Sequence, residues 1–276
     1  MKRLITLLAL LTAAMGAMAQ EADKTVVEVH YQVDFRRNAG DSTLLHDDFA
    51  LWIGERQSKY FSMRTKRNSE VRDSLQKAGY DGQQMLDALR SGVVPRAGQP
   101  YVVMKGWPKE GRMLFLDNVF SDYYGCEDEM YPFDWQLLEG DTVVVGYQCQ
   151  QAQTTWHGRT WTVWYAPDLS YDNGPWKLGG LPGLILSARD AAGDYAMVAQ
   201  AILKGKGEAI DYTEKYEKCA QKDYQALKRK MAEDPTAMLK QRFGSQVQII
   251  SVDTKGRRTE GWIGNTPLFM EIFDKK

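Results

Sequence analysis

Alternating apolar and polar positions dominate the first part of the chain. From Thr25 to Phe35 the odd-numbered positions from 27 onward are apolar, and the positions between them carry Glu, His, Gln and Asp. Strict alternation over this length predicts a strand with one buried face. A turn sequence follows at residues 38–41, and residues 44–53 and 60–63 predict the next two strands.

A basic and polar stretch, residues 66–91, then interrupts the strand pattern. Within it, residues 68–78 and 82–89 have helical spacing, and Ser69 and Asp81 are suited to cap the two helices at their N-termini. We therefore predict a helical insertion between strands. Strand patterns resume after it at residues 100–105, 113–116 and 142–147.

Two hairpins are predicted farther along the chain. His157-Gly158 forms the turn between residues 149–156 and 160–165, and residues 190–194 connect the next two apolar-rich segments. Because connections this short join neighbouring antiparallel strands, the pattern favours a meander.

The C-terminal part predicts an amphipathic helix over residues 212–232, where Tyr216, Tyr224 and Met231 belong to one apolar stripe. Asp234-Pro235 ends this helix. A shorter helix at residues 236–243 and strands at residues 247–252 and 269–273 are expected to follow. The fold class expected from all these elements is α+β and mainly antiparallel: a curved or partly closed β-sheet meander with a helical insertion and a C-terminal helix.

The N-terminus has the parts of a secretory signal peptide. Lys2 and Arg3 precede an apolar run from Leu4 to Met15, and Ala17-Met18-Ala19 has the small residues of a cleavage site. We expect residues 1–19 to be removed and residues 20–276 to form a single β-rich domain. The apolar run is shorter than the roughly 20 residues of a membrane span, so no transmembrane anchor is expected.

Charge and cysteine content restrict the possible partners and the possible disulfides. The 35 basic and 36 acidic residues nearly balance, and without a basic stripe no nucleic-acid partner is expected. Three cysteines in an exported chain allow one disulfide. Cys126 and Cys149 both lie in strand-like segments and are the preferred pair, which leaves Cys219 as a buried free thiol on the predicted helix.

The most distinctive segment, residues 174–186, combines glycines and prolines with one Trp and a block of aliphatic residues. Glycine permits positive φ and proline fixes φ, so a sharply shaped loop leading into a buried strand is expected. It contains the hexapeptide Gly180–Ile185, preceded by Gly146–Cys149, Gly158-Arg159 and Trp164-Tyr165. Together these residues resemble the GLPGLI family of exported Bacteroidetes proteins.

That resemblance implies export, a β-rich fold and the company of outer-membrane receptor systems, and it implies no established activity. We therefore expect a non-catalytic accessory of the periplasm or cell surface, without a cofactor, that binds a protein, peptide or lipid. Trp and Tyr offer large, rigid contact areas. The expected contact residues are Trp164, Tyr165, Pro175, Trp176, Leu181, Pro182 and Leu184.

Two other functions are compatible with the sequence. A secreted hydrolase could use an acidic or histidine site, and His46 with Asp47 is the best candidate pair for it. A purely structural envelope component is the other, in which the glycine-rich segment serves folding alone. The sequence shows neither the ligand spacing of a zinc site nor the glycine-centred calcium loop, and no metal is expected.

Overall fold

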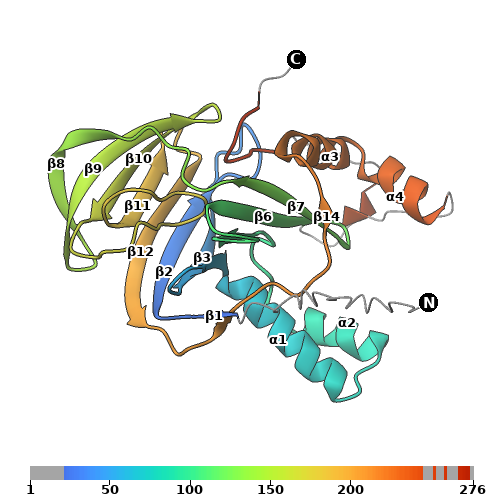
Figure 1. The fold of residues 1–276 in the computed structure, drawn as a ribbon. Helices are drawn as coiled ribbons and strands as arrows, with labels where there is room; N and C mark the ends of the chain where they lie inside the picture. The colour runs from blue at the N-terminus through green and yellow to red at the C-terminus, as the bar shows by residue number, and fades with distance from the viewer. Residues whose placement is uncertain (1–21, 245–250, 253–257, 260–266, 274–276) are drawn as a thin grey trace, which may run out of the picture.

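The computed structural model describes residues 22–244, 251–252, 258–259 and 267–273 of the chain. Within them, twelve strands form one strongly curved sheet with four helices at its flanks (Figure 1). The order across the sheet is β14-β7-β6-β5-β4-β3-β2-β12-β11-β10-β9-β8. The predicted signal peptide, residues 1–19, and residues 247–250 of the predicted strand at 247–252 lie outside the described residues.

Two consecutive meanders build the sheet. The first contains β2 (Val27–Phe35), β3 (Leu45–Ile53), β4 (Ser58–Ser62), β5 (Val102–Lys105), β6 (Arg112–Val119) and β7 (Asp122–Glu129). The second contains β8 (Gln136–Val144), β9 (Tyr147–Trp156), β10 (Arg159–Ala166), β11 (Leu184–Asp190) and β12 (Tyr195–Lys204).

Antiparallel pairing of β12 with β2 joins the two meanders, from Tyr195 opposite Phe35 to Lys204 opposite Val27. The outermost strands, β8 and β14 (Glu217–Lys218), do not pair with each other, so the described sheet is open. β14 is also its one parallel neighbour, paired with β7. The expected α+β class with a mainly antiparallel meander is confirmed.

In the part of the chain that the structure describes, four very short strands form two further sheets of two strands each. β1 (Asp23–Lys24) pairs with β13 (Ala209–Ile210), and β15 (Ser251–Val252) pairs with β16 (Arg258–Thr259). Among the described residues, no helix combines the length and hydrophobicity needed to cross a membrane.

The alternation seen in the sequence decides which face of each strand is buried. In β2, Val29, Tyr31 and Val33 are fully or almost fully buried, as the period of two requires. They belong to a core that extends through both meanders. A second, smaller cluster of buried hydrophobic residues includes Trp52 and Leu114. Strands β3 and β6 contribute residues to both clusters.

The helical insertion is present, with one boundary corrected. α1 (Met63–Lys77) begins six residues before the predicted cap Ser69, because the Ser62 side chain accepts a hydrogen bond from the Thr65 N–H and caps the helix directly after β4. α2 (Gly82–Arg90) has the predicted cap, and Asp81 forms a capping box with Gln84.

The amphipathic helix predicted at residues 212–232 is shorter in the structure. α3 spans Gln221–Glu233, and residues 212–220 are not helical. Tyr216 instead lies over Gly125, where an added Cβ would approach the ring to 2.3 Å, and β14 pairs with β7. Pairing at the sheet edge therefore outweighs the helical spacing of this stretch. α4 (Pro235–Phe243) follows with Asp234 as its N-cap.

The strand predicted at residues 269–273 does not form. Residues 267–273, which we call the C-terminal segment, make one isolated bridge, between Pro267 and Asn38. Their other backbone groups bond to loops and side chains: the Leu268 N–H donates to the Arg37 carbonyl, and the Phe269 carbonyl accepts from Arg159.

Candidate functional site

The glycine-rich segment folds inward. Residues 172–183, which we call the inner loop, form the second part of the connection between β10 and β11, and Trp176, Leu178 and Leu181 are buried in the core that spans both meanders. Gly183 has φ +155° and lies against the Ala166 carbonyl, where an added Cβ would be 2.3 Å from the oxygen. Glycine is required at that position.

A buried lysine from the first meander holds the inner loop in place. Lys105 of β5 donates from Nζ to Asn173 Oδ1 (2.8 Å) and to the carbonyls of Gly174 (2.8 Å) and Leu178 (2.6 Å). Burial lowers the pKa of Lys105 well below its ordinary value, and the charge of Asp172 partly opposes that effect. The loop is thus wrapped around an ammonium group.

Lys177, inside the inner loop, is a second fully buried lysine. Its Nζ lies 2.8 and 2.9 Å from the two carboxylate oxygens of Glu271 and 3.3 Å from Asp128 Oδ2. The ammonium also lies 5.3 Å from the centroid of the Trp156 ring. Burial raises the pKa of Glu271, and the charge and hydrogen bonds of Lys177 oppose that rise.

Asp128, Glu271 and His157 together have the residue types of a metal site, with ligand atoms within 4.8 Å of one another. Lys177 already contacts both carboxylates, so its ammonium occupies the position that a cation would take. His157 lies against Trp156 and Phe273, with ring centroids 4.2 and 4.5 Å away. Burial lowers the pKa of His157, which favours the neutral ring, and the charge of Asp128 opposes that shift.

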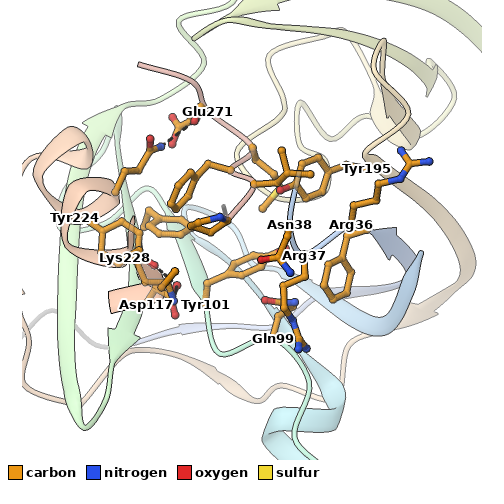
Figure 2. A pocket seen from close by; sticks show the side chains of 18 of the residues that line it. Arg36, Arg37, Asn38, Gln99, Tyr101, Asp117, Tyr195, Tyr224, Lys228 and Glu271 are labelled. Atoms are coloured by element: carbon orange, nitrogen blue, oxygen red, sulfur yellow. Dashed lines mark hydrogen bonds and ion pairs between the residues drawn. The ribbon is translucent and has the colours of Figure 1, made fainter. Parts of the chain in front are cut away.

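The largely apolar cavity beside this cluster has a volume of about 380 Å³. Its walls come from β2, α3, the C-terminal segment and the inner loop, which contributes Trp176. Figure 2 shows Tyr224 and Lys228 on one side of it and Tyr195 and Arg36 on the other. The apolar and aromatic side chains of the wall are Val33, Phe35, Tyr101, Phe115, Trp176, Tyr195, Tyr224, Met231, Ala232, Pro235, Pro267, Leu268, Phe269 and Met270.

Three cations lie among the lining residues. Arg36 Nη1 contacts Asp194 Oδ1 at 3.2 Å, and Lys228 Nζ contacts Asp117 Oδ2 at the same distance. The Arg37 side chain is exposed, and within the described part of the chain it has neither an ion pair nor a side-chain hydrogen bond. Within the described residues, the cavity therefore combines an apolar interior with one exposed positive charge that has no ion pair.

The seven predicted contact residues do not form a surface. Tyr165, Pro175, Trp176, Leu181 and Leu184 are buried, Trp164 is half-buried and Pro182 is exposed. The Tyr165 hydroxyl donates to Gln150 Oε1. Of the seven, Trp176 alone is among the residues that line the cavity.

The cysteine prediction is corrected. All three thiols are free, and Cys126 Sγ lies 3.2 Å from Cys219 Sγ rather than beside Cys149. The Cys149 thiol instead contacts the carbonyl oxygen of Tyr147. Cys219 is half-buried and does not lie in a helix, since α3 begins two residues after it, at Gln221.

The candidate hydrolase pair is separated by the strand itself. His46 and Asp47 are consecutive in β3, so their side chains point to opposite faces. His46 is exposed and contacts Asp34 and Asp48, whereas the Asp47 carboxylate is buried and accepts hydrogen bonds from Ser62 Oγ and the Gln99 N–H. They do not form a catalytic pair.

Sequence analysis missed the two buried lysines and Glu271. A lysine between Trp176 and Leu178, inside the otherwise uncharged segment 174–186, was the available signal for one of them. Nothing local marks Lys105 or Glu271, because their partners are 68 and 94 residues away in the chain.

Comparison with known proteins gives distant structural likenesses. No family model and no curated protein sequence matches the chain. PNGF-II, in two crystal forms, aligns with TM-scores of 0.47 and 0.48 at 16% and 15% identity, over 74% of this chain. The chain spans about a third of the length of PNGF-II, with 33% and 32% covered.

A LolA superfamily protein from Nitrosomonas europaea aligns with a TM-score of 0.26 at 10% identity, over 70% of this chain and 88% of that protein. Likenesses this distant carry no argument about activity or ligand.

Proposed function

We propose that this protein is an exported binding protein that holds the apolar part of an anionic lipid in the cavity between β2, α3 and the C-terminal segment. The observation that supports this proposal is the cavity itself. Its volume of about 380 Å³ lies within the range of small-molecule sites, and its walls are mostly aromatic and aliphatic.

The charge at the cavity favours a ligand with an acidic end. Arg36 and Lys228 are each neutralised by a neighbouring carboxylate, whereas the Arg37 side chain is accessible. A carboxylate or phosphate of the ligand can pair with this guanidinium while the apolar chain enters the cavity. A peptide with an acidic end and an apolar side chain is the competing ligand.

Titration with a fluorescent fatty acid tests the cavity. Met231→Trp fills it from α3 and is expected to weaken binding at least about tenfold. Ala226→Trp is the matched control, since Ala226 is exposed on the same helix and does not line the cavity. Equal affinity of the two variants would contradict the proposal.

A pair of ligands tests the charge. Arg37→Gln is expected to weaken binding of the fatty acid about threefold to fivefold, and to leave binding of the corresponding fatty alcohol unchanged. A variant that binds both as tightly as the wild type would show that Arg37 does not select the ligand. Tighter binding of an acidic apolar peptide than of the fatty acid would assign the site to peptides.

Export and membership of the GLPGLI family belong to the same proposal. The hexapeptide Gly180–Ile185 and the N-terminal pattern of residues 1–19 support them, and an outer-membrane receptor system is the proposed partner. N-terminal sequencing of the protein recovered from the envelope of its own host tests export. We expect the mature chain to begin at Gln20.

A further inference from the structure

Cys126 and Cys219 face each other at the edge of the sheet. Cys126 lies in β7, and Cys219 directly follows β14, the parallel neighbour of β7. The Cys219 N–H donates to the Gly125 carbonyl at 3.0 Å, and the two Sγ atoms are 3.2 Å apart. An S–S bond is about 2.05 Å long, so the sulfur atoms need to approach by only about 1 Å.

We infer that Cys126 and Cys219 form a disulfide bond that fixes the start of α3 to β7. The two cysteines are 93 positions apart, and the chain between them includes all of β8 to β12. Cys149 is not the partner, because Cys126 Sγ faces Cys219 Sγ while the Cys149 thiol lies against the Tyr147 carbonyl. It remains the one reduced cysteine.

The surroundings give the two thiols different roles. Cys219 is half-buried, and the hydrogen bond from Cys126 lowers its pKa, which favours the thiolate. The same hydrogen bond, together with burial, raises the pKa of Cys126. Because Cys219 is half-buried and Cys126 is buried, Cys219 is the sulfur that an external disulfide can reach, and Cys126 is the sulfur that completes the exchange.

The exchange is balanced with a small disulfide, such as oxidised glutathione, as the oxidant. The Cys219 thiolate attacks one sulfur of the oxidant and displaces the other as a thiolate, which leaves a mixed disulfide on Cys219. Cys126 then loses its proton to solvent and attacks Cys219 Sγ, and the second thiolate of the oxidant leaves. Two protein thiols are oxidised, and one external disulfide is reduced to two thiols.

This bond would act on the cavity through α3. The helix begins two residues after Cys219, and Gln221, Tyr224 and Lys228 line the cavity. Formation of the bond depends on the two thiols alone and does not require the cavity to bind a lipid.

Disulfide mapping on the full mature chain tests the inference. The protein is equilibrated with oxidised and reduced glutathione, alkylated after denaturation, and cut with trypsin plus a glutamate-specific protease, which separates Cys126 from Cys149 at Glu127, Glu129 and Glu139. We expect a Cys126–Cys219 cross-link, alkylation of Cys149 alone, and an intact mass lower by about 2 Da before alkylation. Three alkylated cysteines, or a cross-link through Cys149, would overturn the inference.

Two variants serve as controls. Cys149→Ser should keep the cross-link, and Cys126→Ser should leave both remaining cysteines open to alkylation. Amide hydrogen exchange in α3 is expected to accelerate on reduction of the wild type and to be insensitive to reductant in Cys126→Ser. If amide hydrogen exchange in α3 of the wild type does not change on reduction, the disulfide does not stabilise α3. Should Cys126→Ser not fold, mapping of the wild type still decides the pairing.

Discussion

Lys105 shows how a single buried charge can set the shape of a loop. Each of its three bonding partners is an oxygen acceptor, and an ammonium group has three N–H bonds to donate. A neutral amine could satisfy only two of them. Burial lowers the pKa of Lys105, whereas these acceptors favour its charged form. The three hydrogen bonds make Lys105 part of the framework of the inner loop.

Lys105→Met retains most of the side-chain volume and removes the donor of two buried carbonyls, those of Gly174 and Leu178, whereas Asn173 Oδ1 keeps its hydrogen bond from the Gly174 N–H. We expect the free energy of unfolding to fall by about 3–5 kcal/mol, because each unsatisfied buried group costs about 1–3 kcal/mol. Urea denaturation measures the change. Lys204→Met, at an exposed position at the end of β12, should stay within about 0.5 kcal/mol of the wild type. Equal losses in the two variants would show that Lys105 has no special role.

His157 should make stability depend on pH. Its pKa is lowered by burial, so below about pH 6.5 the unfolded chain binds a proton that the folded chain resists. The stabilisation is therefore complete above that pH and is lost as the pH falls toward the folded-state pKa. His157→Gln should flatten the stability profile between pH 7 and pH 5, as measured by denaturant titrations across that range, and a profile as steep as that of the wild type would contradict the assignment.

At the scale of elements, one glycine decides where a strand replaces a helix. Residues 212–220 have the spacing of an amphipathic helix, yet Tyr216 lies in the space left by the missing side chain of Gly125. Its neighbours Glu217 and Lys218 pair with β7. A local pattern cannot reveal this outcome, because the partner is about 90 positions away in the chain.

Gly125→Ala is expected to push the Tyr216 ring away and to release β14 from β7. Amide exchange at Lys218 and Cys219 should then accelerate at least about tenfold, while exchange in β6 remains slow. Gly82→Ala is the matched control, since an added Cβ there meets nothing within 4 Å. Unchanged exchange at Cys219 in the Gly125→Ala protein would show that the glycine is not what admits Tyr216.

Features set by neighbouring residues can be predicted from the sequence, whereas features set by residues distant in the chain cannot. Alternation located most of the strands of both meanders, because it follows directly from burial of one face. The cap at Asp81 and the hairpin turn at His157-Gly158 are equally local and were predicted. The cavity and the contacts of Lys105 and Lys177 form between segments that meet only after the sheet curves, so no local pattern predicts them.

For the whole molecule, the C-terminal segment connects parts that are distant in sequence. Its backbone bonds to Arg37 beside β2 and to the His157 turn of the second meander, and its Glu271 carboxylate pairs with Lys177. The Glu271 carbonyl also accepts a hydrogen bond from Gln225 of α3. One wall of the cavity and one buried ion pair therefore depend on this segment.

Removal of residues 267–276 is expected to destabilise the protein by about 3–5 kcal/mol, because among the described residues it leaves the buried ammonium of Lys177 with Asp128 as its only carboxylate partner. Urea denaturation gives the difference in unfolding free energy. Removal of residues 274–276, which leaves Glu271 in place, is the control and should change the free energy by less than about 0.5 kcal/mol. Similar losses from both truncations would mean that the ion pair does not stabilise the fold.

The open edge of the sheet has a consequence for how copies of the protein behave at high concentration. β8 has a described neighbour on one side only, and Leu137 and Val143 are 66% and 56% exposed. Such an edge is a template for adding strands from another molecule. The register shift between Leu138 and Asp141 interrupts the row of free backbone groups, and the charges of Glu139 and Asp141 flank it. This irregularity opposes edge-to-edge aggregation, so a chain with a regular β8 would be prone to form fibrils.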